Sequence, residues 1–241
     1  MRRRTKILIS IPVLFYILFL ISMWTMIDKR RHNSPRYFTK VEEFKKQNIK
    51  PGSIIFLGNS ITEGYDLEQF YNNSEYINRG IAGDMTSGVL QRLDEIIARH
   101  PEKIVLLIGI NDISRGIDNK EILNNYEKIL KKIKNESPDT KVLVVSVLPV
   151  QNTFSFRRFL VNTAYFLSFV RPYDINGKIV EFNKDLRKLA KKYGYQYIDI
   201  HDNFTDPKGN FLNSEYASDY VHLNEKGYAL MTKLLKPHLL R

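Results

Sequence analysis

The feature that most constrains the fold is an alternation, from residue 53 onward, of short apolar runs with longer amphipathic stretches. Continuous apolar runs of strand length lie at residues 53–57, 103–108 and 141–148, and weaker strand candidates lie at residues 76–78 and 195–200. Continuous runs of this kind fit parallel strands that are covered on both faces. The stretches between the runs have helical periodicity and predict helices over residues 87–100, 120–135, 175–193 and 224–235. The alternation therefore predicts an α/β domain over residues 52–241, with one open parallel sheet of about five strands and helices on both faces.

The composition excludes several classes of protein. Of the 241 residues, 43% are hydrophobic and 26% are charged, which excludes a disordered chain. The absence of cysteine excludes disulfides, cysteine-ligated metal sites, a catalytic thiol and a lipid anchor on cysteine. The net charge of +11 would suit nucleic-acid binding, but residues 1–36 hold eight Lys or Arg and only one acidic residue. Because the basic charge is concentrated at the N-terminal end, we expect no nucleic-acid partner.

The N-terminal end contains an uncharged apolar run of 21 residues, over residues 7–27. At about 1.5 Å per residue, a helix of this length spans roughly 30 Å, the thickness of the hydrocarbon core of a bilayer. We therefore expect a basic N-terminus at residues 1–6, a transmembrane anchor at residues 7–27, and a tether at residues 28–51 with a helix over residues 39–47.

Two alternatives to the anchor are a cleaved signal peptide and a buried helix. The run is longer than the usual apolar region of a signal peptide, and no small-residue cleavage site follows it. Positive charge flanks both ends and is slightly richer at the N-terminus. This distribution favours a single-pass protein with a cytoplasmic N-terminus and a domain in the periplasm or outside the cell.

Residues 151–174 interrupt the alternation. They contain seven aromatic residues and three arginines. Loops in α/β units usually have about 2–6 residues, so a longer segment needs a separate explanation. It is either a lid or binding element at the site, or an additional helix that packs on the core.

A serine follows the first predicted strand, in the sequence GNSITEG at residues 58–64. A serine between a strand and a helix can point its hydroxyl into the cleft at the strand ends, where its own N–H lies beside a developing oxyanion. The motif is not the G-x-S-x-G elbow of α/β-hydrolases, because Thr62 takes the place of the second glycine. Ser60 is therefore a candidate nucleophile, although a turn that caps a helix explains the same residues.

Two further strand ends carry groups that can stabilise an oxyanion. The second predicted strand leads into NRGIAGD at residues 78–84, where a glycine, at position 80 or 83, lets the backbone approach a ligand and present an N–H. The third leads into GIND at residues 109–112, where the side-chain amide of Asn111 is a neutral donor at the same cleft. The alternatives are an ordinary turn with Asp84 or Thr86 as a helix cap, and an Asx turn at Asn111.

His222 is the candidate base among the five histidines, because it lies in the loop before the last predicted helix. Asp219, three residues earlier, can orient the imidazole and stabilise its positive charge, as the acid of a catalytic triad does. The sequence contains no H-E-x-x-H motif and no phosphate-binding glycine loop. We therefore expect no metal and no cofactor, and the acidic residues around His201 fit a turn-rich loop.

Four blocks, in this order, resemble those of the SGNH (GDSL-type) hydrolase superfamily: FLGNSITEG at 56–64, NRGIAGD at 78–84, GIND at 109–112 and DYVHLNEKG at 219–227. The resemblance covers residues 52–240, and it points to the bacterial branch related to platelet-activating-factor acetylhydrolase subunits and carbohydrate O-acetylesterases. It implies a three-layer, flavodoxin-like fold with Ser60 as nucleophile, His222 as base and Asp219 as its acid partner. It also implies an oxyanion hole built from the N–H of Ser60, the N–H of Gly83 and the side chain of Asn111.

The chain departs from the family pattern at two positions. Asn59 replaces the aspartate of the usual Gly-Asp-Ser, and Tyr220 stands where the family has a glycine. Neither change removes a catalytic group, but both can reshape the pocket.

The resemblance implies a serine esterase acting on acetyl or other short acyl esters of small molecules or carbohydrates, and the apolar run at residues 7–27 predicts that it is membrane-anchored. An acyltransferase on the same fold and a lysophospholipase-like lipid acylhydrolase are the enzymatic alternatives. A non-catalytic binding module is the least favoured reading, and the sequence leaves the oligomeric state open.

Overall fold

The computed structural model describes residue 16 and residues 34–47, 49–72, 75–151 and 174–240. Within these residues, no helix is both long and apolar enough to cross a membrane. The anchor predicted at residues 7–27 lies outside the described part except for residue 16. The insertion at residues 151–174 lies outside it except for its first and last residues. Both stay predictions.

Five strands form one sheet in the order β2-β1-β3-β4-β5, and all four pairings are parallel. The strands are β1 Ile54–Gly58, β2 Tyr76–Gly80, β3 Lys103–Leu107, β4 Lys141–Val145 and β5 Gln196–Ile198. The order reverses beside β1, because the chain first moves out to β2 and then crosses back to β3. At such a switch point a doubly wound sheet opens a crevice at the carboxyl ends of its strands. The predicted five-stranded parallel sheet is confirmed.

The three continuous apolar runs form the three central strands. Every residue of β1 and β3 is buried, whereas the edge strands β2 and β5 begin with half-buried or exposed residues. The run predicted to extend to residue 148 leaves the sheet after Val145. The reason is that the side chain of Asn183 replaces a neighbouring strand at Val147. Asn183 Oδ1 accepts the N–H of Val147 and Asn183 Nδ2 donates to its carbonyl oxygen, each at 2.9 Å.

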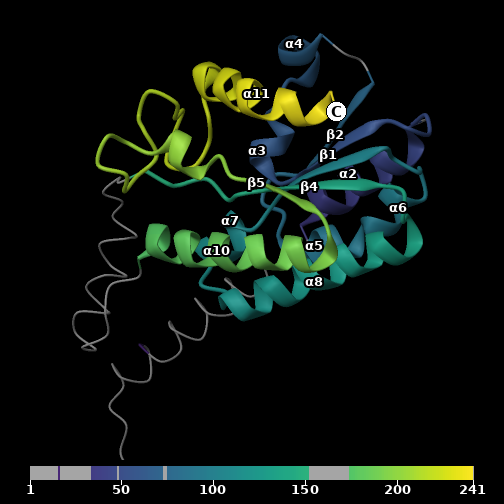
Figure 1. Cartoon of the computed structure of the whole chain (residues 1–241), viewed down its shortest axis with the longest axis horizontal. Helices are drawn as coiled ribbons and strands as arrows, with labels where there is room; N and C mark the ends of the chain where they lie inside the picture. Colours follow the sequence, from purple (N-terminus) through teal and green to yellow (C-terminus); the bar gives the residue numbers. More distant parts are fainter. Residues whose placement is uncertain (1–15, 17–33, 48, 73–74, 152–173, 241) are drawn as a thin grey trace, which may run out of the picture.

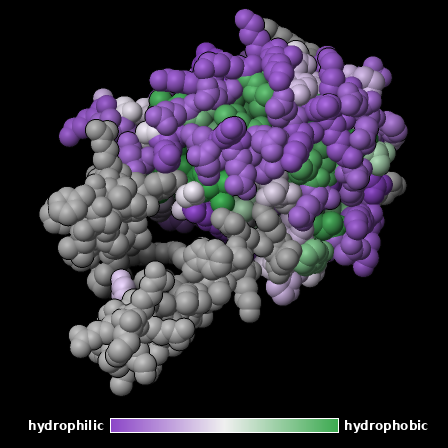
Figure 2. Space-filling model, turned by 90° about the horizontal axis from the view of Figure 1, so that it is seen from below, coloured by the Kyte–Doolittle hydropathy of each residue, from purple (hydrophilic) through white to green (hydrophobic). Residues whose placement is uncertain are grey.

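Helices cover both faces of this sheet, so the molecule has three layers (Figure 1). One face carries α5 Thr86–Gln91, α8 Asn119–Glu136 and α10 Ile175–Tyr193, and the other carries α3 Ser60–Glu63, α4 Leu67–Tyr71 and α11 Glu225–Leu239. The short helix α7 Ile110–Ser114 follows β3, and the 3₁₀ turn η1 His201–Phe204 follows β5. Apolar side chains of α8 and α10 turn inward, and the outer side of this layer is mostly hydrophilic (Figure 2).

The prediction of one continuous helix over residues 87–100 is wrong. The structure has two short helices, α5 and α6 Leu93–Ile97, separated at Arg92, whose φ and ψ are −105° and 8°. The Arg92 side chain is buried and its guanidinium bonds the carboxylate of Asp84 and the carbonyl oxygen of Gly58. The backbone leaves the helical path at the residue that makes these contacts.

The helix expected within the tether is α2 Pro35–Lys46, which begins four residues before the predicted start. It is docked on the domain, because Tyr37 and Phe44 are buried in a small cluster with Ile81. Tyr37 Oη donates to the carbonyl oxygen of Gly88 at 2.8 Å, and the Arg79 guanidinium lies 4.4 Å from the centre of the Phe44 ring. The helix is thus an additional part of the folded unit.

Candidate active site

Ser60 lies at the carboxyl end of β1, as the first residue of α3. Asn59 caps this helix, because its Oδ1 accepts the N–H of Ile61 at 3.0 Å. Gly58 allows the turn, since a Cβ at this position would overlap the carbonyl oxygen of Leu107 in β3. The local sequence therefore places the Ser60 hydroxyl at the switch point of the sheet.

The Ser60 hydroxyl is in hydrogen-bond contact with His222, which is 162 residues away in the chain. Ser60 Oγ lies 2.8 Å from His222 Nε2, and His222 Nδ1 lies 2.7 Å from Asp219 Oδ2. An ionised carboxylate can only accept, so Nδ1 carries the proton and Nε2 is the acceptor that faces Ser60. The arrangement is that of a nucleophile, a base and an orienting acid.

The Asp219 carboxylate is held on both of its oxygens. The oxygen that does not face the ring accepts the N–H groups of Val221 and His222, at 2.9 and 2.8 Å. Partial burial raises the pKa of Asp219, but the hydrogen bonds from the His222 ring and from these two N–H groups outweigh it and lower the pKa to about 2. Asp219 is therefore ionised at neutral pH, where it can stabilise an imidazolium.

The loop that carries this acid–base pair is fastened to α11. Asn224 caps the helix, because its Oδ1 accepts the N–H of Gly227 at 3.0 Å. Its Nδ2 donates to the carbonyl oxygens of Glu215 and Ala217 at 2.8 and 3.2 Å. Gly227 permits the close approach, since a Cβ there would overlap the carbonyl oxygen of Tyr216. The folding of α11 therefore sets the position of the base.

The three candidate oxyanion donors come from the ends of the adjacent strands β1, β2 and β3. The N–H of Ser60 is the first amide of α3 and has no acceptor within the helix. Gly83 has a φ of +79°, a conformation that strains other residues. Asn111, in α7, donates from Nδ2 to the carbonyl oxygen of Asp84 at 2.8 Å, which holds its side chain beside the Gly83 loop. The structure brings these groups to one edge, and their roles stay predictions.

A buried ion pair supports this edge and was missed by the sequence analysis. Arg92 Nε donates to Asp84 Oδ2 at 3.0 Å, and Arg92 Nη2 donates to the carbonyl oxygen of Gly58 at 3.1 Å. One guanidinium therefore connects the end of β1 with the residue after Gly83. Sequence spacing gives little signal for such a pair, because the arginine lies eight residues beyond the aspartate and the two groups meet only in the folded chain.

A second buried carboxylate, Asp112, follows Asn111 and bonds the first residue of α5, Thr86. It accepts the Thr86 hydroxyl at 2.6 Å and the Thr86 N–H at 3.1 Å, and Asn125 Nδ2 donates to the same hydroxyl at 3.1 Å. Burial raises the pKa of Asp112 to about 7, although the hydrogen bonds from Thr86 act in the opposite direction. The N-cap of α5 is Met85, so neither Asp84 nor Thr86 caps this helix, and the N–H of Thr86, its first residue, is bonded by a side chain from another strand end.

His201, His238 and the acidic loop make other contacts. His201 Nδ1 pairs with Asp202 Oδ1 at 2.8 Å, and Asp206 Oδ1 accepts the N–H of Asn210 at 2.9 Å and closes a turn. His238 bonds Gln196 at the far end of α11. Across the described residues, no three His, Cys, Asp or Glu side chains are grouped so that they could hold a metal ion.

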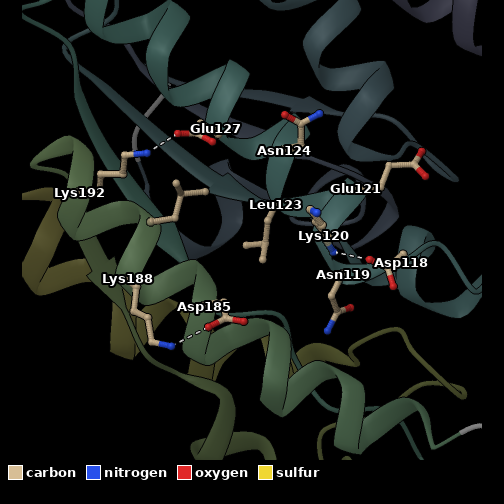
Figure 3. A pocket seen from close by; sticks show the side chains of 11 residues that line it. Asp118, Asn119, Lys120, Glu121, Leu123, Asn124, Glu127, Asp185, Lys188 and Lys192 are labelled. Carbon is tan, nitrogen blue, oxygen red and sulfur yellow. Dashed lines mark hydrogen bonds and ion pairs between the residues drawn. The ribbon is translucent and has the colours of Figure 1, made fainter.

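A surface hollow of about 1000 Å³ lies between α8 and α10 (Figure 3). Most of the side chains around it are charged, and Lys192–Glu127 and Lys188–Asp185 form ion pairs there. None of Ser60, Asp219 and His222 lines it. It is separate from the strand-end site.

Comparison with known proteins decides the family. The model of the GDSL-like Lipase/Acylhydrolase family matches residues 56–230, which include all four sequence blocks. The chain belongs to this family. The GDSL-type acylhydrolases act on ester bonds, so the chain is an ester hydrolase by membership.

Relatives of this acylhydrolase agree with the assignment. The platelet-activating factor acetylhydrolase IB subunit alpha2 of Rattus norvegicus is 26% identical over 195 residues, 78% of this chain and 75% of the rat protein. A solved structure from Streptococcus pneumoniae, described as a platelet activating factor, is 30% identical with a TM-score of 0.71, and the match covers 93% of this chain and 98% of the other. The acetylxylan esterase of Geobacillus stearothermophilus is 15% identical with a TM-score of 0.58 and coverage of 79% and 95%, and it shows the common fold.

Proposed function

We propose that this GDSL-type acylhydrolase is a serine esterase that cleaves carboxylic esters through an acyl-enzyme on Ser60. The observation that carries the proposal is the contact of Ser60 Oγ with His222 Nε2 at 2.8 Å, with Asp219 2.7 Å behind the ring. A serine hydroxyl is a weak nucleophile unless a base within hydrogen-bond reach takes its proton. His222 is in that position, and Asp219 sets its tautomer.

The first half of the reaction transfers the acyl group to the protein. Ser60 Oγ attacks the ester carbonyl carbon while its proton moves to His222 Nε2. The carbonyl oxygen becomes an oxyanion that the N–H groups of Ser60 and Gly83 and the amide of Asn111 stabilise. The bond to the alcohol then breaks, and His222 returns the proton to the leaving oxygen.

The second half releases the acid. Water attacks the acyl carbonyl of the intermediate while His222 takes one of its protons, and the same donors bind the second oxyanion. Ser60 leaves as the alcohol with the proton from His222. In each half Asp219 stays ionised and stabilises the imidazolium.

We further propose acetyl or other short acyl esters as substrates, carbohydrate esters among them. The name of the rat relative, an acetylhydrolase, supports a short acyl group. The fold that the chain has in common with the acetylxylan esterase keeps acetylated sugars among the candidates. We place the domain in the periplasm or outside the cell, held by residues 7–27. Support comes from the length of the uncharged run and from its basic flanks.

The substitution Ser60→Ala tests the chemistry. We expect the purified full chain with this change to lose hydrolysis of p-nitrophenyl acetate, because the nucleophile is gone, and to keep the melting temperature of the parent. Ser114→Ala, at an exposed serine at the end of α7, is the matched control and should keep full activity. Turnover by Ser60→Ala above about a tenth of the parent rate would exceed what the oxyanion hole alone supplies and would refute the nucleophile.

A substrate panel tests the acyl group. p-Nitrophenyl esters of rising chain length, beside acetylated sugars, should show the highest kcat/KM for the shortest acyl chains. A preference for long chains would favour a lipid acylhydrolase, and acyl transfer to an added alcohol in place of free acid would favour a transferase.

A further inference from the structure

Glu63 holds the segment that presents one of the oxyanion donors. It is the last residue of α3, three residues after Ser60, and its Oε2 accepts the N–H of Ala82 at 2.9 Å. Its other oxygen, Oε1, accepts from Arg36 Nη2 of α2 at 2.8 Å. One carboxylate therefore joins the helix of the nucleophile, the segment before Gly83, and a helix from outside the predicted domain.

The peptide of Gly83 is fixed from both sides. On one side is the bond from Ala82 to Glu63. On the other side, the carboxylate of Asp84 is paired with the buried guanidinium of Arg92. The backbone carbonyl oxygen of Asp84 accepts a hydrogen bond from Asn111 Nδ2. Ala82 and Gly83 are exposed, so hydrogen bonds rather than burial set the direction of the Gly83 N–H.

Arg36 is held in place because α2 is docked along its length. Ser34 caps the helix, and Tyr37 Oη, one residue after Arg36, bonds the carbonyl oxygen of Gly88 at 2.8 Å. At the other end of α2, Phe44 is covered by the Arg79 guanidinium. The Arg36 side chain is 54% exposed and that of Glu63 is 23% exposed, so their pair contributes little to global stability.

We propose that Glu63 and Arg36 are positioning residues for the oxyanion hole, through which the docked helix α2 keeps the Gly83 N–H aimed at the reacting carbonyl. The inference rests on the proposed roles of Ser60 and Gly83. Both residues act through Ala82 and need no contact with the substrate. A donor that is displaced by a fraction of an ångström stabilises the transition state less while substrate binding is unchanged.

Steady-state kinetics on the full chain, with p-nitrophenyl acetate, tests the inference. We expect Glu63→Ala to lower kcat by about 10- to 100-fold with KM unchanged, a smaller loss than Asn111→Ala, which removes a donor outright. Arg36→Ala should lower kcat by about three- to fivefold, within what an exposed ion pair contributes. The double variant should be no worse than Glu63→Ala alone, because both changes break one connection.

Conservative variants separate positioning from a general structural role. Glu63→Gln keeps an oxygen for the N–H of Ala82 and loses the ion pair, so its kcat should match that of Arg36→Ala. Arg36→Lys keeps the charge and should recover most of the parent kcat. Added salt should lower the kcat of the parent toward that of Arg36→Ala and leave the variant unaffected, since salt screens an exposed pair.

Lys45→Ala is the matched control, because the Lys45 side chain is as exposed as that of Arg36 and forms an ion pair with Glu42 on the same helix, at 2.7 Å. It should keep the parent kcat, and all variants should melt with the parent. A kcat of Glu63→Ala equal to that of Lys45→Ala, or a loss that follows a lowered melting temperature, would overturn the inference. These outcomes would not affect the proposed nucleophile, provided that Ser60→Ala is inactive in the same assay.

Discussion

At the scale of single residues, Asp112 is a buried group whose protonation links stability to pH. Its carboxylate is buried and its pKa is raised from 3.8 to about 7, with burial as the first cause. Between these two values the folded protein holds a proton that the unfolded chain has released. Protonated Asp112 therefore stabilises the fold at low pH, and this contribution to the free energy of unfolding is lost as the pH rises from about 4 to about 7.

The substitution Asp112→Asn should remove this dependence. The amide is neutral at every pH and its oxygen can still accept the Thr86 hydroxyl and N–H. We expect the variant to match the parent near pH 4 and to become progressively more stable than the parent toward pH 8, by urea unfolding at a series of pH values. Asp118→Asn, at the exposed cap of α8, is the control and should not change this slope. A variant that loses stability equally at all pH values would show that Asp112 is ionised in the folded protein.

Part of the candidate site could be proposed from the sequence because three of its residues follow recognisable strands. Ser60, Gly83 and Asn111 each lie within five residues of the end of a predicted strand, and parallel strands bring their carboxyl ends to one edge. His222 could be chosen by its place before the last helix and by Asp219 beside it. Glu63, Arg92 and Asp112 could not be assigned in this way, because their partners are backbone groups or side chains that only the folded chain brings near.

At the scale of elements, the break between α5 and α6 shows the limit of reading helices by periodicity. The apolar positions of residues 87–100 fit one helix, and four of the five residues on its apolar face are buried. The four are Val89, Leu93, Ile96 and Ile97, and the fifth, Leu90, is half-buried. Nothing in this spacing marks Arg92 as the end of a helix. In the structure its guanidinium turns inward to Asp84 and Gly58, and the helix is interrupted there.

The substitution Arg92→Leu should therefore be strongly destabilising. It leaves the buried carboxylate of Asp84 without its cation, and breaking a buried pair in this way costs about 3–5 kcal/mol. Urea unfolding measures the loss, and Asp84→Asn in the same variant should restore part of it.

The control for this change is Lys132→Leu, which removes the cation from an exposed pair. Lys132 pairs with Asp94, whose side chain is 75% exposed, so the loss should stay below about 1 kcal/mol. If Arg92→Leu costs no more than this control, Asp84 is protonated in the folded protein, a direction in which burial already raises its pKa.

At the scale of the whole molecule, the sheet and its layers followed from the sequence, whereas the docking of α2 did not. Continuous apolar runs of strand length that alternate with amphipathic stretches predict buried parallel strands. The short helix before the domain is polar outside and buries only Tyr37 and Phe44. In the sequence, a helix with only two such side chains looks like an ordinary exposed helix. The surface that covers them, at Ile81 and Arg79, exists only in the folded protein.

The anchor is the prediction that belongs to this scale. We expect residues 7–27 to keep the full chain in the membrane fraction through an alkaline carbonate wash, because a run of 21 uncharged residues spans the bilayer core. Protease added to intact spheroplasts should then digest the domain. A mature N-terminus after residue 27 would refute the anchor, and protection from external protease would refute its orientation.

The long separation between Ser60 and His222 has a consequence for the order of events in synthesis. The nucleophile and the base are 162 residues apart, and the base belongs to the segment that precedes the final helix. A ribosome releases Ser60 long before His222, so a nascent chain that stops short of residue 222 holds the proposed nucleophile without its proposed base. Such a chain should be inert even when all five strands are present. In a translocated protein, we therefore expect esterase activity only in the compartment that receives residue 222.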